Sequence, residues 1–112
     1  MIKDSFRVKQ ISDIIFKNLA TIIQAKVRDP RLQSFVITKV DVSRDIKNAR
    51  VYYILGESAD KKEAKKALSK ARLYLQTMLS QTTNLKYTPK LRFIYDVADE
   101  KCRRLDSILQ SL

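Results

Sequence analysis

Between residues 49 and 96 the chain carries a strand pattern, a long helical pattern and a second strand pattern, and this order limits the fold more than any other feature. The segments "ARVYYIL" (49–55) and "KLRFIYD" (90–96) are rich in the β-branched and aromatic residues that strands favour. A strand, a helical crossover and a second strand normally form a right-handed unit with the two strands parallel. We therefore expect a sheet that contains one parallel pair.

An earlier strand is expected in "SFVITKVDV" (34–42), whose residues alternate between two sides. Val36 and Val40 fall on one side, and Phe35 and Ile37 fall on the other. The short connection to residues 49–55 favours antiparallel pairing of these two strands. The predicted sheet is therefore mixed and three-stranded.

Two amphipathic helices are predicted, one before the first strand in the sequence and one after the second strand. The first spans residues 4 to about 26, with Asp4 or Ser5 as its cap, and ends before Pro30, which disfavours helical angles at the preceding residue. Its apolar stripe comprises Val8, Ile11, Ile15, Leu19, Ile22 and Ile23. This spacing predicts one long helix with a single buried face.

The second helix begins near "ESADKKEAKK" (57–66), with Ser58 or Asp60 as candidate cap. Its apolar stripe comprises Ala64, Ala67, Leu68, Ala71, Leu75, Met78 and Leu79. Leu73 falls outside that stripe, so either it is a singly exposed leucine or the helix bends near Ala71. A closing helix is predicted in "VADEKCRRLDSILQSL" (97–112).

The resulting order, α-β-β-α-β-α with a kink possible in the second helix, predicts an α+β fold with helices covering the sheet. It fits a type II KH-like domain, in which we expect the third strand to lie parallel to the first. A ferredoxin-like sandwich is the alternative, but it needs a strand before the first helix, where "MIKD" is short and polar. At 112 residues the chain is expected to form one domain, residues 1–112.

The charge balance indicates a polyanionic partner. There are 23 Lys and Arg residues against 12 Asp and Glu, which gives a net charge of +11 without any histidine. Such an excess attracts nucleic acid or an anionic membrane surface. Nucleic acid is the favoured partner, and a basic amphipathic module that docks on anionic lipid or an acidic protein is the alternative.

Other residue types argue against cofactors and export. The single Cys102 cannot form an internal disulfide, and without histidine no zinc site is expected. Because Leu105 and Leu109 follow it at helical spacing, we expect Cys102 to be a small buried hydrophobe. No signal peptide or membrane span is expected either, which predicts a cytoplasmic protein without a cofactor.

Catalysis is the weaker interpretation of this sequence. One glycine cannot build a phosphate-binding loop, and the closest acidic cluster is Asp96, Asp99 and Glu100. These acids stand at a predicted helix start, where capping explains them better than metal binding. A small Mg²⁺-dependent nuclease that uses them is the enzyme alternative. We expect no catalytic and no metal-binding residues.

Two basic segments are the candidate nucleic-acid contacts. They are the connection between the first two strands and the second helix, where Glu63 is the only carboxylate between Asp60 and Asp96. The expected phosphate contacts are Arg44, Lys47, Arg50, Lys62, Lys65, Lys66, Lys70 and Arg72. The tyrosines are expected to pack in the core or at its edge, so none is assigned to base recognition.

Three segments together resemble the ribosome-binding factor A family. They are "VRDPRLQSFVITKVDVSRDIKNARVYY", "LSKARLYLQTML" and "TPKLRFIYDVADEKCRRLDSIL", which span nearly the whole chain in family order. The resemblance implies a cytoplasmic assembly factor with a type II KH-like fold that acts by binding. We expect the protein to be a monomer. It further implies binding to the maturing small (30S) ribosomal subunit, help in 16S rRNA processing, notably at the 5′ end, and a role in cold adaptation.

The resemblance also gives roles to individual residues. Ser43 and Asp45 look like a family signature that shapes the strand connection through hydrogen bonds to the backbone. The family has an Ala-x-Gly kink between two helices, and Ala71 matches its alanine while Leu73 stands in place of its glycine. We expect the bend to survive in a milder form, without a continuous helical hydrogen-bond ladder through residues 68–76.

Overall fold

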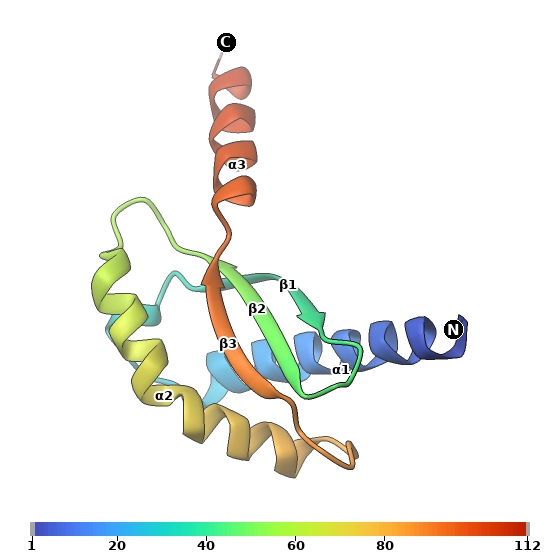
Figure 1. Cartoon of the computed structure of the whole chain (residues 1–112). Coiled ribbons are helices and arrows are strands. Elements are labelled where there is room, and N and C mark those ends of the chain that lie inside the picture. Colours follow the sequence, from blue (N-terminus) through green and yellow to red (C-terminus); the bar gives the residue numbers. More distant parts are fainter. Residues whose placement is uncertain (1, 112) are drawn as a thin grey trace.

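The computed structural model describes residues 2–111 as a three-stranded sheet and three α-helices (Figure 1). The elements are α1 (Ile2–Lys26), the 3-10 helix η1 (Pro30–Leu32), β1 (Val36–Val42), β2 (Asn48–Ile54), α2 (Lys61–Thr82), β3 (Lys90–Tyr95) and α3 (Val97–Gln110). This order confirms the predicted α+β fold. Because the chain is already helical from Ile2 and no strand precedes α1 in the described residues, the ferredoxin-like alternative is wrong.

The sheet has the order β1-β2-β3, with β1 and β2 antiparallel and β2 and β3 parallel. The mixed three-stranded sheet is therefore confirmed. The expectation that the third strand lies parallel to the first is wrong, because α2 crosses over from β2 to β3 and so makes that pair parallel. In consequence β3 runs opposite to β1.

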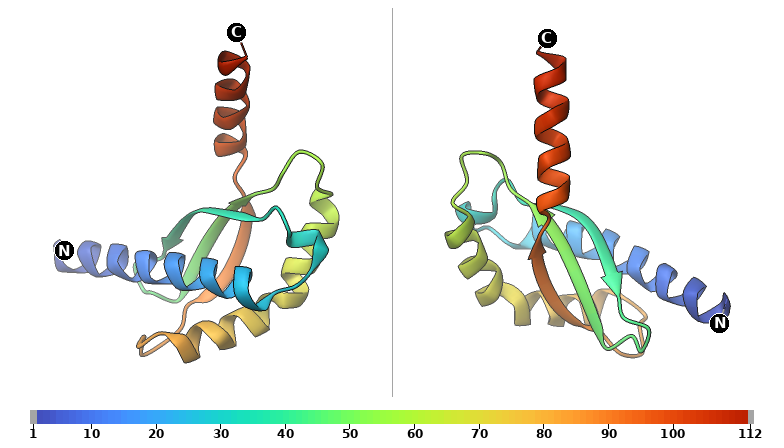
Figure 2. Two further views of the ribbon diagram at one scale, coloured as in Figure 1. Left: turned by 180° about the vertical axis from the view of Figure 1, so that it is seen from behind. Right: turned by 45° about the horizontal axis from the view of Figure 1, so that its top comes forward.

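The core lies between α1, α2 and one face of the sheet. Ile15 and Leu19 on α1 are fully buried, as are Val51 on β2 and Leu75 on α2. Burial of each such side chain contributes about 1.5–3 kcal/mol. Figure 1 and the view from behind in Figure 2 show α1 across one face of the sheet, while no helix crosses the other face. One face of the sheet therefore stays open.

The N-terminal helix starts earlier in the chain than predicted and ends where it was expected to end. It begins at Ile2, so Asp4 and Ser5 belong to its first turns and the prediction that one of them caps it is wrong. At the other end Asp29 is extended, with φ −102° and ψ 121°, as the residue before Pro30 should be. Its carboxylate caps η1 by accepting from the Arg31 backbone N–H at 2.9 Å.

Helix α2 is one helix and not two. Asp60 caps it by accepting from the backbone N–H groups of Lys62 at 3.0 Å and Glu63 at 3.2 Å. The α-helix is uninterrupted through residues 68–76, so the predicted break is wrong. Without glycine no residue favours a break there. The axis instead curves around the core, as both figures show, and Leu73 lies 69% exposed on the outside.

The connection between β1 and β2 is held by its own side chains. The Ser43 hydroxyl donates to Asp45 at 2.6 Å, and Asp45 also accepts from the Lys47 backbone N–H at 3.1 Å. The Asn48 backbone N–H donates to the Ser43 hydroxyl at 3.1 Å. These bonds confirm the expected structural role of Ser43 and Asp45. They hold Ile46 at a positive φ of 61°.

Helix α3 projects away from the rest of the molecule (Figures 1 and 2) and has no buried residue. Cys102 is exposed, so the prediction of a buried cysteine is wrong. The physical reason is that Leu105 and Leu109, which share its stripe, are themselves 60% and 65% exposed. Within residues 2–111, none of the helices combines the length and the apolarity needed to cross a bilayer.

Candidate nucleic-acid interface

A groove of about 550 Å³ lies between α2 and β3. It is lined by Asn48, Lys65, Leu68, Ser69, Arg72, Lys90, Leu91, Arg92 and Phe93, and we call it the α2–β3 groove. Leu68 and Leu91 are each 1% exposed, so the groove borders on the core. Among the residues that the structure describes, its lining includes four cationic side chains and no carboxylate. Such a surface attracts anions more strongly than an exposed helix face with mixed charges does.

Regular secondary structure places the four cations. Lys65 and Arg72 are seven residues apart, which puts them on the same side of α2 two turns apart. Lys90 and Arg92 flank the buried Leu91 and therefore share the other side of β3. Lys90 and Arg92 were absent from the predicted contacts. Their alternation around Leu91 is visible in the sequence, but nothing there relates β3 to α2.

The open face of the sheet continues the groove. In the parallel register Arg50 lies beside Arg92, and Asn48 lies beside Lys90. Arg50 forms an ion pair with Asp41 at 2.8 Å, but its side chain stays 53% exposed. Arg50 is thus the predicted contact that extends the basic surface of the groove onto the sheet.

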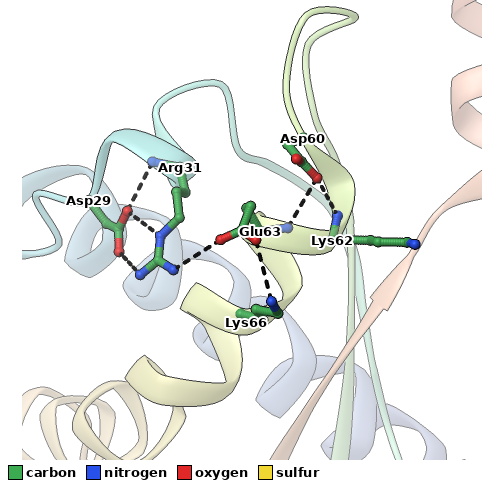
Figure 3. Close-up of polar contacts among 6 residues, drawn as sticks. All are labelled: Asp29, Arg31, Asp60, Lys62, Glu63 and Lys66. Carbon is green, nitrogen blue, oxygen red and sulfur yellow. Dashed lines mark hydrogen bonds and ion pairs between the residues drawn. The ribbon is translucent and has the colours of Figure 1, made fainter.

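The other side of α2 carries an ion-pair cluster, formed by Asp29, Arg31, Glu63 and Lys66 (Figure 3). Arg31 lies 2.8 Å from Asp29 and 3.7 Å from Glu63, and Lys66 lies 3.4 Å from Glu63. Hydrogen bonds from Arg31 lower the pKa of Asp29 to about 2. Because Glu63 lies next to Lys66, this carboxylate partly offsets the positive charge of Lys66.

The remaining predicted contacts lie in two places. In Figure 3 the Lys62 side chain points away from the ion-pair cluster, and Lys62 and Lys70 are exposed on α2. Arg44 and Lys47 are exposed on the β1–β2 turn. The Lys47 carbonyl accepts from the Lys90 backbone N–H at 2.9 Å, which attaches this turn to the start of β3. The turn is thus joined to the strand that forms one wall of the groove.

The acids at the start of α3 are engaged within the protein. Asp96 accepts from the Thr38 hydroxyl at 2.6 Å and from the Asp99 backbone N–H at 3.0 Å, and the first of these bonds lowers its pKa. The other partners are Arg103 for Asp99, and Tyr95, Lys61 and Arg104 for Glu100. Among the side chains that the structure describes, no group of three or more His, Cys, Asp or Glu residues could hold a metal ion. These contacts explain the acids as caps and ion pairs.

The tyrosines divide between core and surface. Tyr53 is 4% exposed and stacks on Phe35, with ring centroids 5.0 Å apart. Tyr52 belongs to the open face, where the Lys39 ammonium lies 4.5 Å from its ring centroid. Tyr74 and Tyr87 are 47% and 74% exposed, which core or edge packing does not explain.

Comparison with known proteins gives one consistent family. The profile of "Ribosome-binding factor A" matches residues 7–109. Ribosome-binding factor A from Coxiella burnetii is 41% identical over 106 residues, covering 95% of this chain and 89% of the relative. The protein of the same name from Vesicomyosocius okutanii is 37% identical over 108 residues, covering 96% and 94%.

Solved structures agree with the sequence matches. The crystal structure of ribosome-binding factor A from Thermus thermophilus has a TM-score of 0.72 at 27% identity, covering 79% of this chain and 93% of that one. A Thermus thermophilus model fitted into the cryo-EM map of a 30S–RbfA complex has a TM-score of 0.63 at 30% identity, covering 75% and 89%. The chain therefore belongs to the ribosome-binding factor A family, whose members are ribosome-binding factors and not enzymes.

Proposed function

We propose that this chain is an assembly factor that binds the maturing small (30S) ribosomal subunit in the cytoplasm, as a monomer, through its 16S rRNA. It acts by binding, as one KH-like RNA-binding domain. Through that binding it assists 16S rRNA processing at the 5′ end and supports growth in the cold.

The observation that carries this proposal is the α2–β3 groove. Lys65, Arg72, Lys90 and Arg92 line it without a carboxylate, and the open face with Arg50 adjoins it. A strand of RNA presents phosphates along one edge, and a row of Lys and Arg side chains binds them with release of counterions. The small subunit as partner is supported by the 30S complex of the Thermus thermophilus relative.

The predicted contacts differ in their surroundings, and this difference supports unequal roles for them in the proposal. Lys65 and Arg72 face the groove, whereas Lys66 lies against Glu63 and Lys70 lies near enough to Asp29 to help lower its pKa. We propose that the groove side of α2 makes the main phosphate contacts, since its charges meet no carboxylate. Arg44 and Lys47 extend the contact along the β1–β2 turn.

The test is co-sedimentation of the purified protein with small subunits, large subunits and whole ribosomes across a salt series. We expect selective retention on free small subunits that falls as salt rises. Lys65→Gln combined with Arg72→Gln should weaken retention and reduce the slope of log affinity against log salt by about 0.7–0.9 for each phosphate that is no longer neutralised. Lys65 is exposed and Arg72 is half-buried outside the core, so thermal stability should stay nearly unchanged.

The matched control is Lys66→Gln combined with Lys70→Gln, which removes the same charge from the other side of the same helix. It should reduce retention less than the groove pair does. Equal losses in the two pairs would mean that overall charge and not the groove governs binding. Equal retention of the wild-type chain on every particle would contradict the small subunit as its specific partner.

A further inference from the structure

A second cavity lies at the end of the sheet opposite to α3. The first half of α1, the β1–β2 turn and the α2–β3 loop converge there (Figures 1 and 2). The cavity has a volume of about 640 Å³, within the range of pockets that hold small ligands. We call it the turn cavity, and it is lined by Arg7, Ile11, Asp45, Ile46, Lys47, Leu85, Lys86, Tyr87 and Thr88.

The inner wall of the turn cavity is apolar and held in place. Ile11 is 7% exposed, and the half-buried Ile46 and Leu85 pack against the core. Ile46 has φ 61°, a left-handed conformation that is strained for a β-branched residue. The Ile46 N–H donates to the Ser43 carbonyl at 2.9 Å, and the Ser43–Asp45 bonds close the turn around it. The turn therefore holds the Ile46 side chain at the cavity instead of releasing it to solvent.

The rim of the turn cavity is cationic and aromatic. Arg7, Lys47 and Lys86 stand around it, and among the described side chains of residues 6–111 its lining has Asp45 as the one carboxylate. Asp45 is already an acceptor for the Ser43 hydroxyl and the Lys47 N–H. Tyr87 is 74% exposed, with the Lys86 ammonium 5.7 Å from its ring centroid. Such a ring exposes apolar area to solvent without contributing to the core.

This combination matches the chemistry of an unpaired nucleotide. A base out of the duplex stacks on an aromatic ring and leaves water for an apolar surface, while its two flanking phosphates need cations nearby. A paired base cannot do this, because its faces are covered by its neighbours in the stack. An apolar peptide segment would use the wall of the cavity but not its three cations.

We propose that the turn cavity binds one unpaired nucleotide of a single-stranded RNA segment, with the base on Tyr87 and its flanking phosphates on Arg7, Lys47 and Lys86. This inference rests on the proposed function and specifies the form of RNA recognised. The Lys47 carbonyl accepts from the Lys90 N–H, and Lys90 lines the α2–β3 groove. One strand can therefore run from the groove to the cavity.

The test measures binding of labelled RNA by fluorescence anisotropy at fixed salt. Three probes of eight nucleotides each are used: a single-stranded octanucleotide, the same strand with one abasic position, and a hairpin whose paired stem is closed by a non-nucleotide linker, so that it contains no unpaired base. Tyr87→Ala should weaken binding of the single strand about 5- to 150-fold, the equivalent of removing one base–aromatic stack. Tyr87→Phe keeps the ring and should bind as the wild type does.

Two further comparisons give the specificity. The hairpin should bind wild-type and Tyr87→Ala protein equally, and the series with the abasic position moved along the strand should include one RNA on which Tyr87→Ala has no effect. The matched control is Tyr74→Ala, which removes another exposed tyrosine, on α2 and outside the turn cavity. It should leave all three affinities unchanged.

The outcomes separate this inference from the proposed function. If the wild type binds neither RNA nor small subunits, the proposed function fails. If it binds both but Tyr87→Ala binds every probe as the wild type does, or loses hairpin binding equally, only the nucleotide site is overturned. Capture of an apolar peptide by the wild type but not by Tyr87→Ala, with RNA affinity unchanged, would also overturn it.

Discussion

Helices α1 and α3 are both amphipathic, yet α1 has a buried face and α3 does not. On α1, Ile15 and Leu19 are fully buried against the sheet and α2. On α3, Leu105 and Leu109 are 60% and 65% exposed, and the helix leaves the body at the end of β3 (Figure 1). An apolar stripe identifies the face of a helix that can be buried. It does not identify a surface within the same chain that buries it.

The attachment of α3 is correspondingly polar and local. Asp96 links the start of the helix to Thr38 on β1, and Glu100 bonds with Tyr95 and Lys61. All of these contacts lie within the first turns. Within the described residues, the hydrogen bonds and ion pairs of the rest of the helix lie within α3 itself, such as that of Arg103 with Asp99 at 2.8 Å. Mutations in α1 should therefore change the free energy of unfolding more than mutations in α3 do.

The largest expected difference is between Leu19→Ala and Leu109→Ala. Leu19→Ala removes a fully buried side chain and leaves a cavity, so it should lower the free energy of unfolding by about 2–5 kcal/mol. Leu109→Ala changes an exposed site and should stay within about 0.5 kcal/mol of the wild type. Urea unfolding followed by circular dichroism measures both. A similar loss in the two variants would mean that α3 is packed in solution.

A smaller difference should appear between the caps of α2 and α3. Asp60→Ala should lower the free energy of global unfolding by about 0.5–2 kcal/mol, because α2 carries buried residues that link it to the core. Asp96→Ala removes the cap of α3 and its bond to Thr38. Its effect should be confined to faster amide hydrogen exchange within residues 97–110, since α3 can open without the core. Faster exchange in α1 as well would contradict this separation.

The smallest expected effects concern the dependence of stability on pH in acid. Arg31 lowers the pKa of Asp29 from 3.8 to about 2, so this carboxylate stabilises the folded state above the unfolded pKa, and that contribution is lost as pH falls through about 2. Asp29→Asn should remove this part of the pH dependence of the urea midpoint. The effect should be small because the pair is only partly buried, so that solvent screens it.

The matching variant in α3 is Glu100→Gln. Tyr95 and Lys61 lower the pKa of Glu100 below its usual 4.5, so its contribution is also present at neutral pH and lost in acid. Here the change should appear as increased amide exchange at the start of α3, with the global urea midpoint unchanged. A shift of the global midpoint would show that α3 unfolds together with the core.

Most elements of the fold could be predicted from local patterns. The period of the apolar residues located α1, α2 and both antiparallel strands, and Pro30 located the end of α1. The direction of β3 relative to β1, the uninterrupted α2 and the exposure of Cys102 were predicted wrongly. The exposure of Cys102 depends on what packs against α3, which periodicity along one element does not contain. The other two follow from the sequence: the antiparallel and parallel pairs predicted for the three strands already set β3 opposite to β1, and residues 68–76 contain no glycine that would favour a break in α2.

For the candidate interface, too, some features could be predicted from local patterns and others could not. The sequence identified Lys65 and Arg72 as basic residues of one helix, but it did not separate them from Lys66 and Lys70. It also did not bring in Lys90 and Arg92, because β3 joins α2 in one groove only through the crossover. The turn cavity depends even more on the fold, since Ile11, Ile46 and Tyr87 come from three separate segments.

By itself, the sequence determined the secondary structure, the basic character and the family of this protein, because period, composition and motif are properties of neighbouring residues. Only the tertiary structure decided which apolar stripe is buried and which cations share a surface. The physical reason is that burial and electrostatic focusing depend on distances between segments that are far apart in the chain. Those distances exist only once the sheet and its helices have packed.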